Sequence, residues 1–264
     1  MFNAKEEVNK IVEFIRSYYK KNNLKGAVLG ISGGKDSAVV AALFAKALGS
    51  ENVLGVTLPC HSKEIDAIDA KLVSDKYGFD LINIDLTPVY DSFINEINKL
   101  GNYNENELNN SNINLKPRLR MASVYYLAAL YSKLKGGTYI VAGTSNLCEL
   151  YVGYFTKGGD SSYDIGVLNN YTVEEVIKIG EYLEVPEKVL YKTPHDGLSK
   201  SSDEEKLGVK YSEIAEVINN PENPNVSKEA YQRIMKLHNN NQHKFNPATY
   251  IRKWYESRSF CRKF

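Results

Sequence analysis

The sequence predicts an α/β fold, built as a doubly wound, mainly parallel sheet with helices on both faces. Short apolar runs alternate with longer segments of helical periodicity, and this alternation is typical of parallel strands joined by crossover helices. A glycine-rich turn at residues 30–37 lies between the first apolar run and the next helix. With 264 residues, 43% of them hydrophobic, the chain can bury a sizeable core, and we expect one domain over residues 1–264.

The predicted elements follow from the apolar spacing. A packing helix over 4–22 precedes a buried strand at 27–31, and a helix rich in alanine over 38–48 ends at Gly49. The elements that follow are strands at 52–58, 79–85 and 138–144 and helices at 63–77, 88–100, 172–183, 207–218 and 227–238. Since ligands of such sheets bind beyond the carboxyl ends of the strands, the turn at 30–37 is expected at the binding edge.

Residues 101–114 are mostly Asn and Glu without an apolar period, which predicts a loop. Pro117 is then expected to open a long helix over 117–131, because proline is favoured in the first helical turn. Arg118 and Arg120 would lie in that turn, where the helix dipole disfavours cations. They are either solvated or ion-paired side chains, or a clamp for an anionic ligand.

The turn Gly30-Ile-Ser-Gly-Gly-Lys-Asp-Ser37 has the order strand, glycines, helix that suits a phosphate-binding loop. Its glycines let the backbone approach an anion, and the first N–H groups of the helix point at it. It is not a Walker A loop, because Asp36 separates Lys35 from Ser37. A carboxylate beside phosphates needs a bridging divalent cation, so we expect Asp36 to bind magnesium. The alternative is an ordinary strand-to-helix turn.

Other polar segments follow the later strands. Glu149 comes soon after the strand at 138–144, and residues 153–164 combine glycines, a lysine and two aspartates, which predicts a binding loop at the same edge. Residues 192–206 are polar and lack a period, and we interpret them as a lid that orders over bound substrates.

Composition excludes several classes of function. The formal net charge of +1, with both signs interspersed, gives no basis for binding nucleic acid or a membrane surface. Three cysteines and four histidines lack the spacing of a disulfide framework or a zinc cluster. No apolar run approaches the ~18 residues that a membrane helix needs, and no signal peptide is apparent, so we expect a soluble, cytoplasmic protein.

Several ordered motifs resemble those of ammonia-dependent NAD synthetases, which belong to the ATP pyrophosphatase superfamily with its Rossmann-like fold. The resemblance runs from about residue 24 to about residue 247. The motifs are the turn at 30–37, Pro117-Arg-Leu-Arg-Met121, Gly143-Thr-Ser-Asn-Leu-Cys-Glu149, Gly153-Tyr-Phe-Thr-Lys-Gly-Gly-Asp160, the segment 194–208 and Gln242-His-Lys244. The resemblance implies that ATP adenylates the nicotinate carboxylate of deamido-NAD and that ammonia then forms the amide of NAD.

The resemblance also implies a role for individual residues and a homodimer. ATP would be bound by Gly30, Ile31, Ser32, Gly33, Gly34, Lys35, Asp36, Ser37, Thr144 and His195; Mg²⁺ by Asp36 and Glu149; deamido-NAD by Arg118, Lys157, Asp164, His243 and Lys244; and Asp36, Lys157 and Lys192 would take part in catalysis. The tyrosine-rich helix at 121–134 offers apolar surface for a dimer, unless its tyrosines are core.

The chain departs from the family pattern at two positions. Val173 stands where many relatives have a lysine that contacts ATP, and His195 stands where many have Ser or Thr; the histidine either replaces that donor or is a plain loop residue. The alternative hypotheses are a pyrophosphatase that amidates another nucleotide, as GMP synthetase does, and a non-catalytic nucleotide-binding relative. Because no glutaminase-like segment is apparent, we expect ammonia to be free or supplied by a separate protein.

Overall fold

The computed structural model describes residues 2–62, 64–101, 103–193 and 202–245, and in them five strands form one parallel sheet of order β3-β2-β1-β4-β5. The strands are β1 (Leu24–Gly30), β2 (Val53–Thr57), β3 (Asp80–Asn83), β4 (Thr138–Gly143) and β5 (Ile165–Gly166). Ala27 of β1 lies opposite Val53 of β2, and Val28 lies opposite Val141 of β4. The predicted α/β fold with a parallel sheet is therefore confirmed, and the described strands pair in parallel only.

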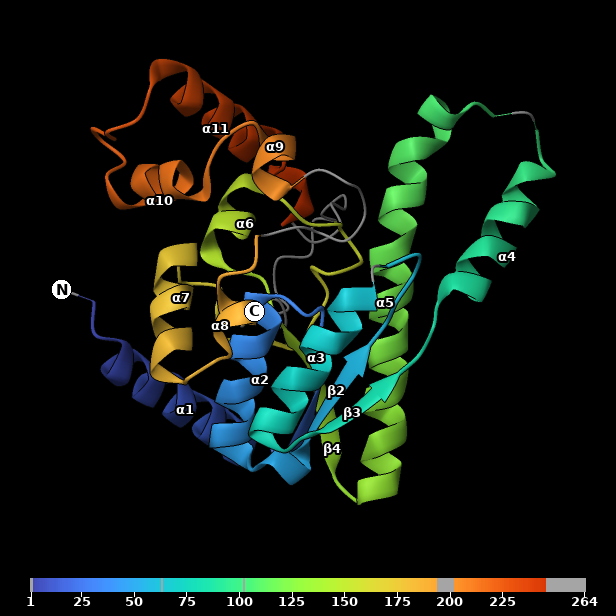
Figure 1. Ribbon diagram of the computed structural model, residues 1–264, viewed down its shortest axis with the longest axis vertical. Helices are drawn as coiled ribbons and strands as arrows, with labels where there is room; N and C mark the ends of the chain where they lie inside the picture. Colours follow the sequence, from blue (N-terminus) through green and yellow to red (C-terminus); the bar gives the residue numbers. More distant parts are fainter. Residues whose placement is uncertain (1, 63, 102, 194–201, 246–264) are drawn as a thin grey trace, which may run out of the picture.

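Helices cover both faces of this sheet (Figure 1). The described helices are α1 (Ala4–Lys21), α2 (Lys35–Leu48), α3 (Glu64–Tyr77), α4 (Thr87–Asn98), α5 (Glu105–Lys135), α6 (Leu147–Val152), α7 (Val173–Tyr182), α8 (Glu187–Leu190), α9 (Asp203–Leu207), α10 (Tyr211–Asn219) and α11 (Lys228–Asn240). Helices α1, α2, α3, α7 and α8 pack on one face, and α4 and α5 lie on the other. None of the described helices is long and apolar enough to cross a bilayer.

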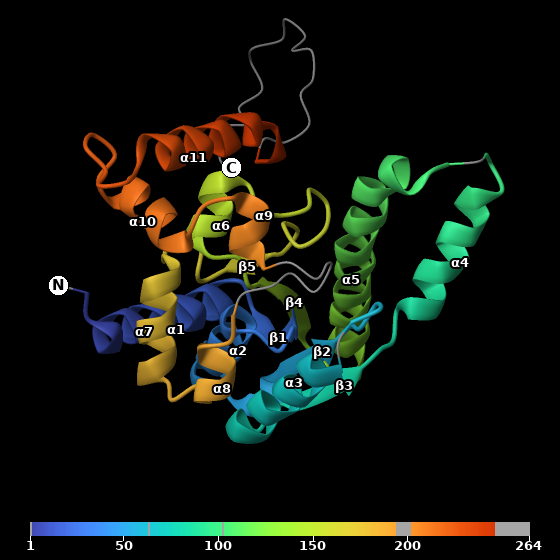
Figure 2. The same ribbon diagram turned by 45° about the horizontal axis from the view of Figure 1, so that its top comes forward.

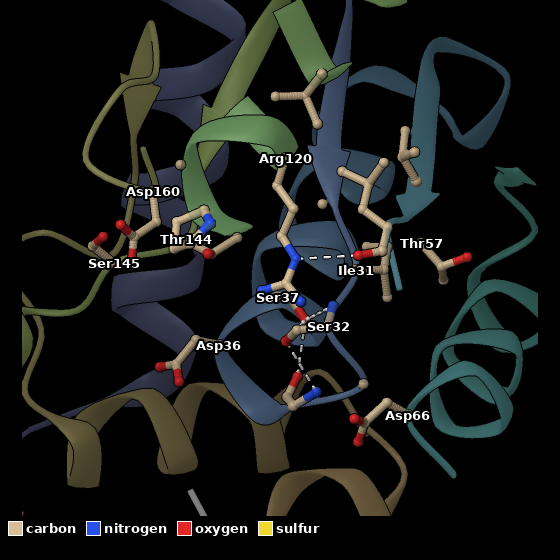
Figure 3. Close-up of a pocket in the computed structure, with 18 of the residues that line it drawn as sticks. Ile31, Ser32, Asp36, Ser37, Thr57, Asp66, Arg120, Thr144, Ser145 and Asp160 are labelled. Atoms are coloured by element: carbon tan, nitrogen blue, oxygen red, sulfur yellow. Dashed lines mark hydrogen bonds between the residues drawn. The ribbon is translucent and has the colours of Figure 1, made fainter. Parts of the chain in front are cut away.

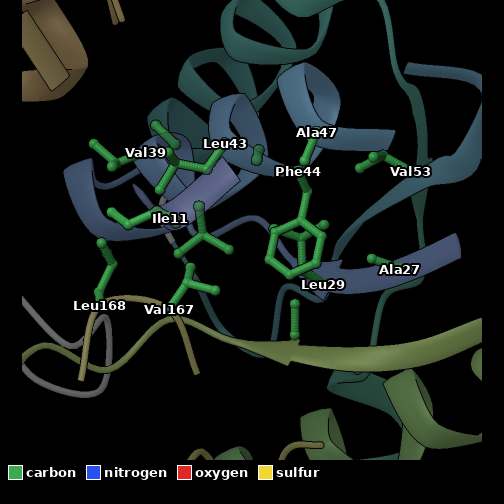
Figure 4. Packing of buried hydrophobic residues seen from close by; sticks show 14 of the residues in the cluster. Ile11, Ala27, Leu29, Val39, Leu43, Phe44, Ala47, Val53, Val167 and Leu168 are labelled. Atoms are coloured by element: carbon green, nitrogen blue, oxygen red, sulfur yellow. The ribbon is translucent and has the colours of Figure 1, made fainter. Parts of the chain in front are cut away.

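The alternating side chains of β1 supply the two cores. Ala27 and Leu29 point toward α1 and α2, where Phe44 is fully buried (Figure 4). The ring of Phe44 meets the ring of Tyr19 edge-on at 6.1 Å between centroids. Val28 points to the opposite face and packs with Val124, Leu127 and Ala128 of α5. Because both faces are buried over residues 26–29, this part of β1 is a continuous apolar run, which is typical of strands in parallel sheets.

A further apolar cluster lies beside the sheet and joins α6, α9, α10 and α11 into a cap near the carboxyl ends of the strands (Figure 2). Its fully buried side chains include Cys148 of α6, Ile214 of α10 and Ile234 of α11. This cluster fixes α6 over the edge of the sheet at which the predicted binding loops meet.

The predicted loop at 101–114 is wrong, because α5 already begins at Glu105 and Pro117 lies inside it. The helix starts with a capping box, in which the Asn104 side chain accepts the Glu107 N–H at 3.1 Å and the Glu107 carboxylate accepts the Asn104 N–H at 2.8 Å. The first part of α5 extends past the sheet, so it needs no apolar period (Figure 1). Arg118 therefore lies in the middle of a helix and not in a first turn.

The predicted helix at 207–218 is wrong at its start, because two helices occupy this region. Helix α9 begins after the cap residue Ser202 and ends at Leu207, where Gly208 takes φ +71°. The chain then turns and α10 begins at Tyr211. A left-handed glycine after the last helical residue is a common helix stop, and this signal at Gly208 was present in the sequence.

Phe44→Ala is expected to lower the free energy of unfolding by about 3–5 kcal/mol, because it leaves a cavity between α1, α2 and the sheet. Phe14→Ala is the matched control: Phe14 is 52% exposed on α1, so its loss should cost less than about 1 kcal/mol. Urea unfolding followed by circular dichroism measures both values. Similar costs for the two variants would contradict the assigned core.

Candidate active site

A cavity of about 330 Å³ opens at the carboxyl ends of β1, β2 and β4. It is enclosed by the β1–α2 loop, the segment after β2, the middle of α5 and the loop that follows α6 (Figure 3). Polar and charged side chains from these elements converge here, although the elements are far apart in sequence. The position agrees with the rule that places ligands beyond the carboxyl ends of parallel strands.

The β1–α2 loop has the conformation of an anion-binding turn. Gly33 takes φ +74°, and a Cβ at this position would lie 2.5 Å from the carbonyl oxygen of Asp66 in α3. Both the backbone conformation and the close approach of α3 therefore require glycine here. The Ser37 hydroxyl accepts the Ser32 N–H at 3.2 Å and donates to the Gly34 carbonyl at 3.1 Å. These bonds hold the loop around the start of α2, where backbone N–H groups are available to an anion.

Lys35 and Asp36 begin α2 and form an ion pair of 2.9 Å between Nζ and Oδ2. Lys35 is only 6% exposed, and burial lowers its pKa, but the carboxylates of Asp36 and Glu149 outweigh this effect and the pKa is raised. The amine therefore stays charged beside the phosphate-binding turn at neutral pH.

The buried side chain of Asn146 joins the two predicted metal ligands. Its Nδ2 donates to Asp36 Oδ1 at 3.2 Å, and its Oδ1 accepts the Glu149 N–H at 3.0 Å. In return, Glu149 Oε2 accepts the Asn146 N–H at 3.1 Å, which completes a capping box at the start of α6. Glu149 therefore both caps a helix and presents a carboxylate to the cavity.

Burial raises the pKa of Glu149 well above its usual value, and the neighbouring carboxylate of Asp36 raises it further. Two carboxylates that disfavour each other's charge are a suitable place for a cation. Among the described residues no group of three or more His, Cys, Asp or Glu could hold a metal ion. A pair of carboxylates nevertheless fits magnesium, which is usually held by one or two carboxylates together with substrate phosphates.

The loop after α6 closes another side of the cavity. Asp160 Oδ1 accepts the Thr156 N–H at 2.7 Å; enclosure by the protein raises the pKa of its carboxyl group, although backbone N–H groups and nearby cations partly oppose this. The ring of Tyr163 lies against Gly143 at the end of β4, where a Cβ would come within 2.3 Å of it. Glycine at 143 is thus needed for this loop to approach the sheet.

The cavity brings together many of the residues that the sequence predicted for ATP and magnesium. Its lining includes residues 30–37, Thr144, Glu149 and Lys192. Lys192 Nζ contacts Asp66 Oδ1 at 2.8 Å and Asp69 Oδ2 at 2.7 Å, and it donates to the Gly33 carbonyl at 3.4 Å, so it ties α3 to the phosphate-binding turn. His195 and most of the predicted lid, residues 194–201, lie outside the described residues.

Residues predicted to bind deamido-NAD form a second group beside the cavity. The Arg118 guanidinium donates to the Lys157 carbonyl at 3.3 Å, and Lys157 Nζ donates to the His243 carbonyl at 2.8 Å. Lys244 Nζ donates to the carbonyls of Gly153 and Phe155 at 2.7 and 2.9 Å, which anchors the start of the loop after α6. None of the predicted deamido-NAD residues is in the lining of the described cavity.

Asp164, also predicted to bind deamido-NAD, contacts two elements of the fold. Its carboxylate accepts the Val141 N–H of β4 at 2.8 Å and the Tyr125 hydroxyl of α5 at 3.2 Å. It therefore helps to join β4 to α5, and its role toward a ligand stays a prediction. Val173, the departure noted above, is 8% exposed and packs in the apolar cluster of α6, α10 and α11.

Sequence reasoning missed Asn146 and Asp66 as site residues. It named Arg120 only as one of two arginines that could clamp an anion, and Asp160 only as part of a binding loop; Asp66, Arg120 and Asp160 all line the cavity. For Asn146 a signal existed, since Asn followed three residues later by Glu is the pattern of a capping box. Asp66 belongs to a segment whose pattern predicts an amphipathic helix with a solvent-exposed polar side. Nothing in its local sequence indicates that α3 contacts the phosphate-binding turn.

Comparison with known proteins decides the family. The profile of the NAD synthase family matches residues 7–248. The chain belongs to the NAD synthase family. An NH(3)-dependent NAD(+) synthetase of Carboxydothermus hydrogenoformans is 35% identical over 243 residues, covering 92% of this chain and 95% of that protein. Another, from Methanocaldococcus jannaschii, is 38% identical over 222 residues, covering 81% of this chain and 80% of the relative.

Solved structures of NAD synthase relatives have the same fold. An NMN synthetase from Francisella tularensis superposes with a TM-score of 0.85 at 33% identity, covering 95% of this chain and 99% of that one. An NH3-dependent NAD synthetase from Campylobacter jejuni, determined in complex with nitrate, superposes with a TM-score of 0.74 at 25% identity, covering 95% and 100%. The predicted family is confirmed.

In the absence of metal, Glu149→Gln is expected to leave the free energy of unfolding unchanged or to raise it. The change removes one of two carboxylates that repel each other, and the Gln side chain still offers an oxygen acceptor to the Asn146 N–H. Glu149→Ala loses that acceptor and should cost about 1 kcal/mol. Both changes, and Asp36→Asn, should lower turnover by about 10²-fold or more. Urea unfolding in a chelator and steady-state kinetics test this; near-normal turnover of Glu149→Gln and Asp36→Asn at saturating magnesium would rule out the metal assignment.

Proposed function

We propose that this NAD synthase family member converts deamido-NAD to NAD, with ATP activating the nicotinate carboxylate and ammonia supplying the amide nitrogen. One observation carries the proposal: the phosphate-binding turn and the Asp36–Glu149 pair line the same cavity. The chain belongs to the NAD synthase family, and this site suits the chemistry that the family name describes. We treat residues 1–264 as a single domain for this activity.

In this proposal, the N–H groups at the start of α2 bind the phosphates of ATP, and Lys35 adds a positive charge beside them. Asp36 and Glu149 hold Mg²⁺, which when bound neutralises charge on the phosphates. The Ser32 and Ser37 hydroxyls fix the turn, so little reorganisation is needed when ATP binds. Catalysis then consists mostly of positioning and charge compensation.

The reaction needs no covalent bond to the enzyme. A carboxylate oxygen of the nicotinate attacks the α-phosphorus of ATP, the bond to the β-phosphate oxygen breaks, and pyrophosphate leaves. Ammonia then attacks the carbonyl carbon of the adenylate, loses a proton, and AMP leaves with the electron pair of the broken C–O bond. Holding the two reactants in line can supply much of the rate enhancement.

The second group of cations, Arg118, Lys157 and Lys244, supports the binding of a second anionic substrate. Arg118 and Lys157 are exposed, and both belong to the cluster that joins α5, the loop after α6 and the 3-10 turn Gln242–Lys244 that follows α11. Burial lowers the pKa of Lys244, although Asp160 acts in the opposite direction. The phosphates of a dinucleotide are suitable ligands for such a group.

A second candidate substrate is the mononucleotide. It is favoured by the likeness to the NMN synthetase structure, which covers 99% of that chain at a TM-score of 0.85. Such an enzyme would convert nicotinate mononucleotide to NMN by amidating its carboxylate, with the same adenylation chemistry. The two candidates differ only in whether an adenosine monophosphate unit extends from the acceptor.

The acceptor assay distinguishes these functions. We expect AMP and amide product to form from ATP, Mg²⁺, ammonium and deamido-NAD, with a kcat/KM higher for deamido-NAD than for nicotinate mononucleotide. The reverse order would establish the mononucleotide function, and AMP formation only with xanthosine monophosphate would identify a GMP synthetase-like enzyme. A folded protein that binds ATP but forms no AMP with any acceptor would be a non-catalytic relative.

A homodimer is the proposed assembly, and the exposed apolar side chains of α4 and α5 support it. They are Val89, Phe93, Tyr126, Leu130 and Leu134. Tyr126, Leu130 and Leu134 recur every four residues on α5 and so share one side of this helix, where a second copy of the chain could cover them.

Leu134→Glu is expected to shift the protein from dimer to monomer, because Leu134 is 67% exposed in the single chain and a charge there opposes burial at an interface. Sedimentation velocity at micromolar concentration measures the shift, and circular dichroism checks that the variant is folded. A fully active wild-type monomer at that concentration would contradict the assembly.

A further inference from the structure

Arg118 and Arg120 are two residues apart on α5, but they have different surroundings. Two helical positions are separated by about 200° around the axis, so the side chains leave opposite sides of the helix. Arg118 is exposed and donates to the Lys157 carbonyl outside the cavity. Arg120 is half-buried and belongs to the cavity lining; its side chain extends from α5 toward the loop that carries Ser32 and Ser37 (Figure 3).

The Arg120 guanidinium is held in place by the segment after β2. Its Nε donates to the Leu58 carbonyl at 3.1 Å, and one terminal nitrogen donates to the Ser62 hydroxyl at 3.4 Å. These bonds orient the planar group before any ligand arrives. A pre-oriented guanidinium loses little conformational freedom on binding an anion.

The cavity is acidic, which makes a tightly positioned cation valuable there. Among its described lining residues, the carboxylates are Asp36, Asp66, Glu149, Asp160 and Asp203, and the cations are Lys35, Arg120 and Lys192. Lys35 is paired with Asp36 at 2.9 Å, and Lys192 with Asp66 at 2.8 Å. Arg120 differs from both lysines in its planar guanidinium, which the segment after β2 orients in the cavity.

The field of Arg120 also reaches the loop after α6. It lowers the pKa of Asp160 against the larger, opposite effect of the surrounding protein, although the Asp160 side chain keeps solvent-exposed surface. Since Asp160 and the β1–α2 loop belong to the same cavity lining, a phosphate bound in that cavity lies within reach of the same positive field.

We propose that Arg120 contacts ATP directly: its guanidinium binds a phosphate oxygen from the α5 side of the cavity, and so compensates the charge carried by the α-phosphate and the departing pyrophosphate. This role deepens the proposed function and rests on it. A planar guanidinium can donate two parallel hydrogen bonds to a phosphate, which an ammonium group cannot do.

Arg120→Gln is expected to weaken ATP binding by about 10- to 100-fold, the usual cost of losing a hydrogen bond to a charged group. Titration calorimetry of the full chain with ATP and Mg²⁺, without an acceptor, measures this directly. The result is therefore independent of which acceptor the enzyme uses. Arg120→Lys should recover part of the affinity, and Arg118→Gln, the matched control, should leave ATP affinity unchanged.

Ser62→Ala separates contact with ATP from positioning of the segment after β2. If Arg120 binds phosphate, Ser62→Ala changes ATP affinity by less than Arg120→Gln does, because the guanidinium and its bond to the Leu58 carbonyl remain. Equal losses in the two variants would mean that Arg120 only holds this segment. An ATP affinity of a folded Arg120→Gln protein within about twofold of wild type, well below the cost of one charged hydrogen bond, would overturn the proposal.

Discussion

The placement of two carboxylates, Asp36 and Glu149, around one buried residue, Asn146, is the constraint on which the site depends: the Asn146 side chain donates to Asp36 and its backbone N–H donates to Glu149. Asn146 has no exposed surface and bonds to both. The carboxylates disfavour each other's charge, and the protein sustains them with Lys35, with the start of α2 and with the capping box of α6. The starts of α2 and α6 therefore carry the two negative charges, of Asp36 and Glu149, that a bound cation would balance.

A second coupling connects the phosphate-binding turn to the segment before residues 194–201. Lys192 contacts Asp66, Asp69 and the Gly33 carbonyl, and Lys188 meets the other oxygen of Asp69 at 2.9 Å. The carboxylates hold the pKa of Lys192 above its usual value although burial acts in the opposite direction. The phosphate-binding turn is thus held by the hydrogen bonds of its own serines, Ser32 and Ser37, and by Lys192, which connects it to α3.

Local chemistry predicted four of the five described strands and the phosphate-binding turn, because these depend on residues close in sequence: a short apolar run, a glycine that tolerates φ +74°, and a helix start. It missed β5, which is only two residues long. It failed for the first half of α5, whose Asn and Glu residues have no apolar period because the helix extends past the core. It raised Arg118 and Arg120 together as a possible anion clamp but could not separate them, because a helix inferred to begin at Pro117 put both arginines in one turn. Asp66 reaches the cavity through long-range packing of α3 against the phosphate-binding turn, which no local pattern indicates.

The bonds of Lys244 to the loop after α6 bear on how the protein is made. The amine of Lys244 reaches back to the carbonyls of Gly153 and Phe155, about ninety positions earlier, and Asn241 donates to the Val152 carbonyl at 2.9 Å. During synthesis from the N-terminus the sheet and the phosphate-binding turn can assemble first. The loop after α6 lacks these anchors until residue 244 has left the ribosome, so a nascent chain acquires its nucleotide-binding turn well before this loop is secured.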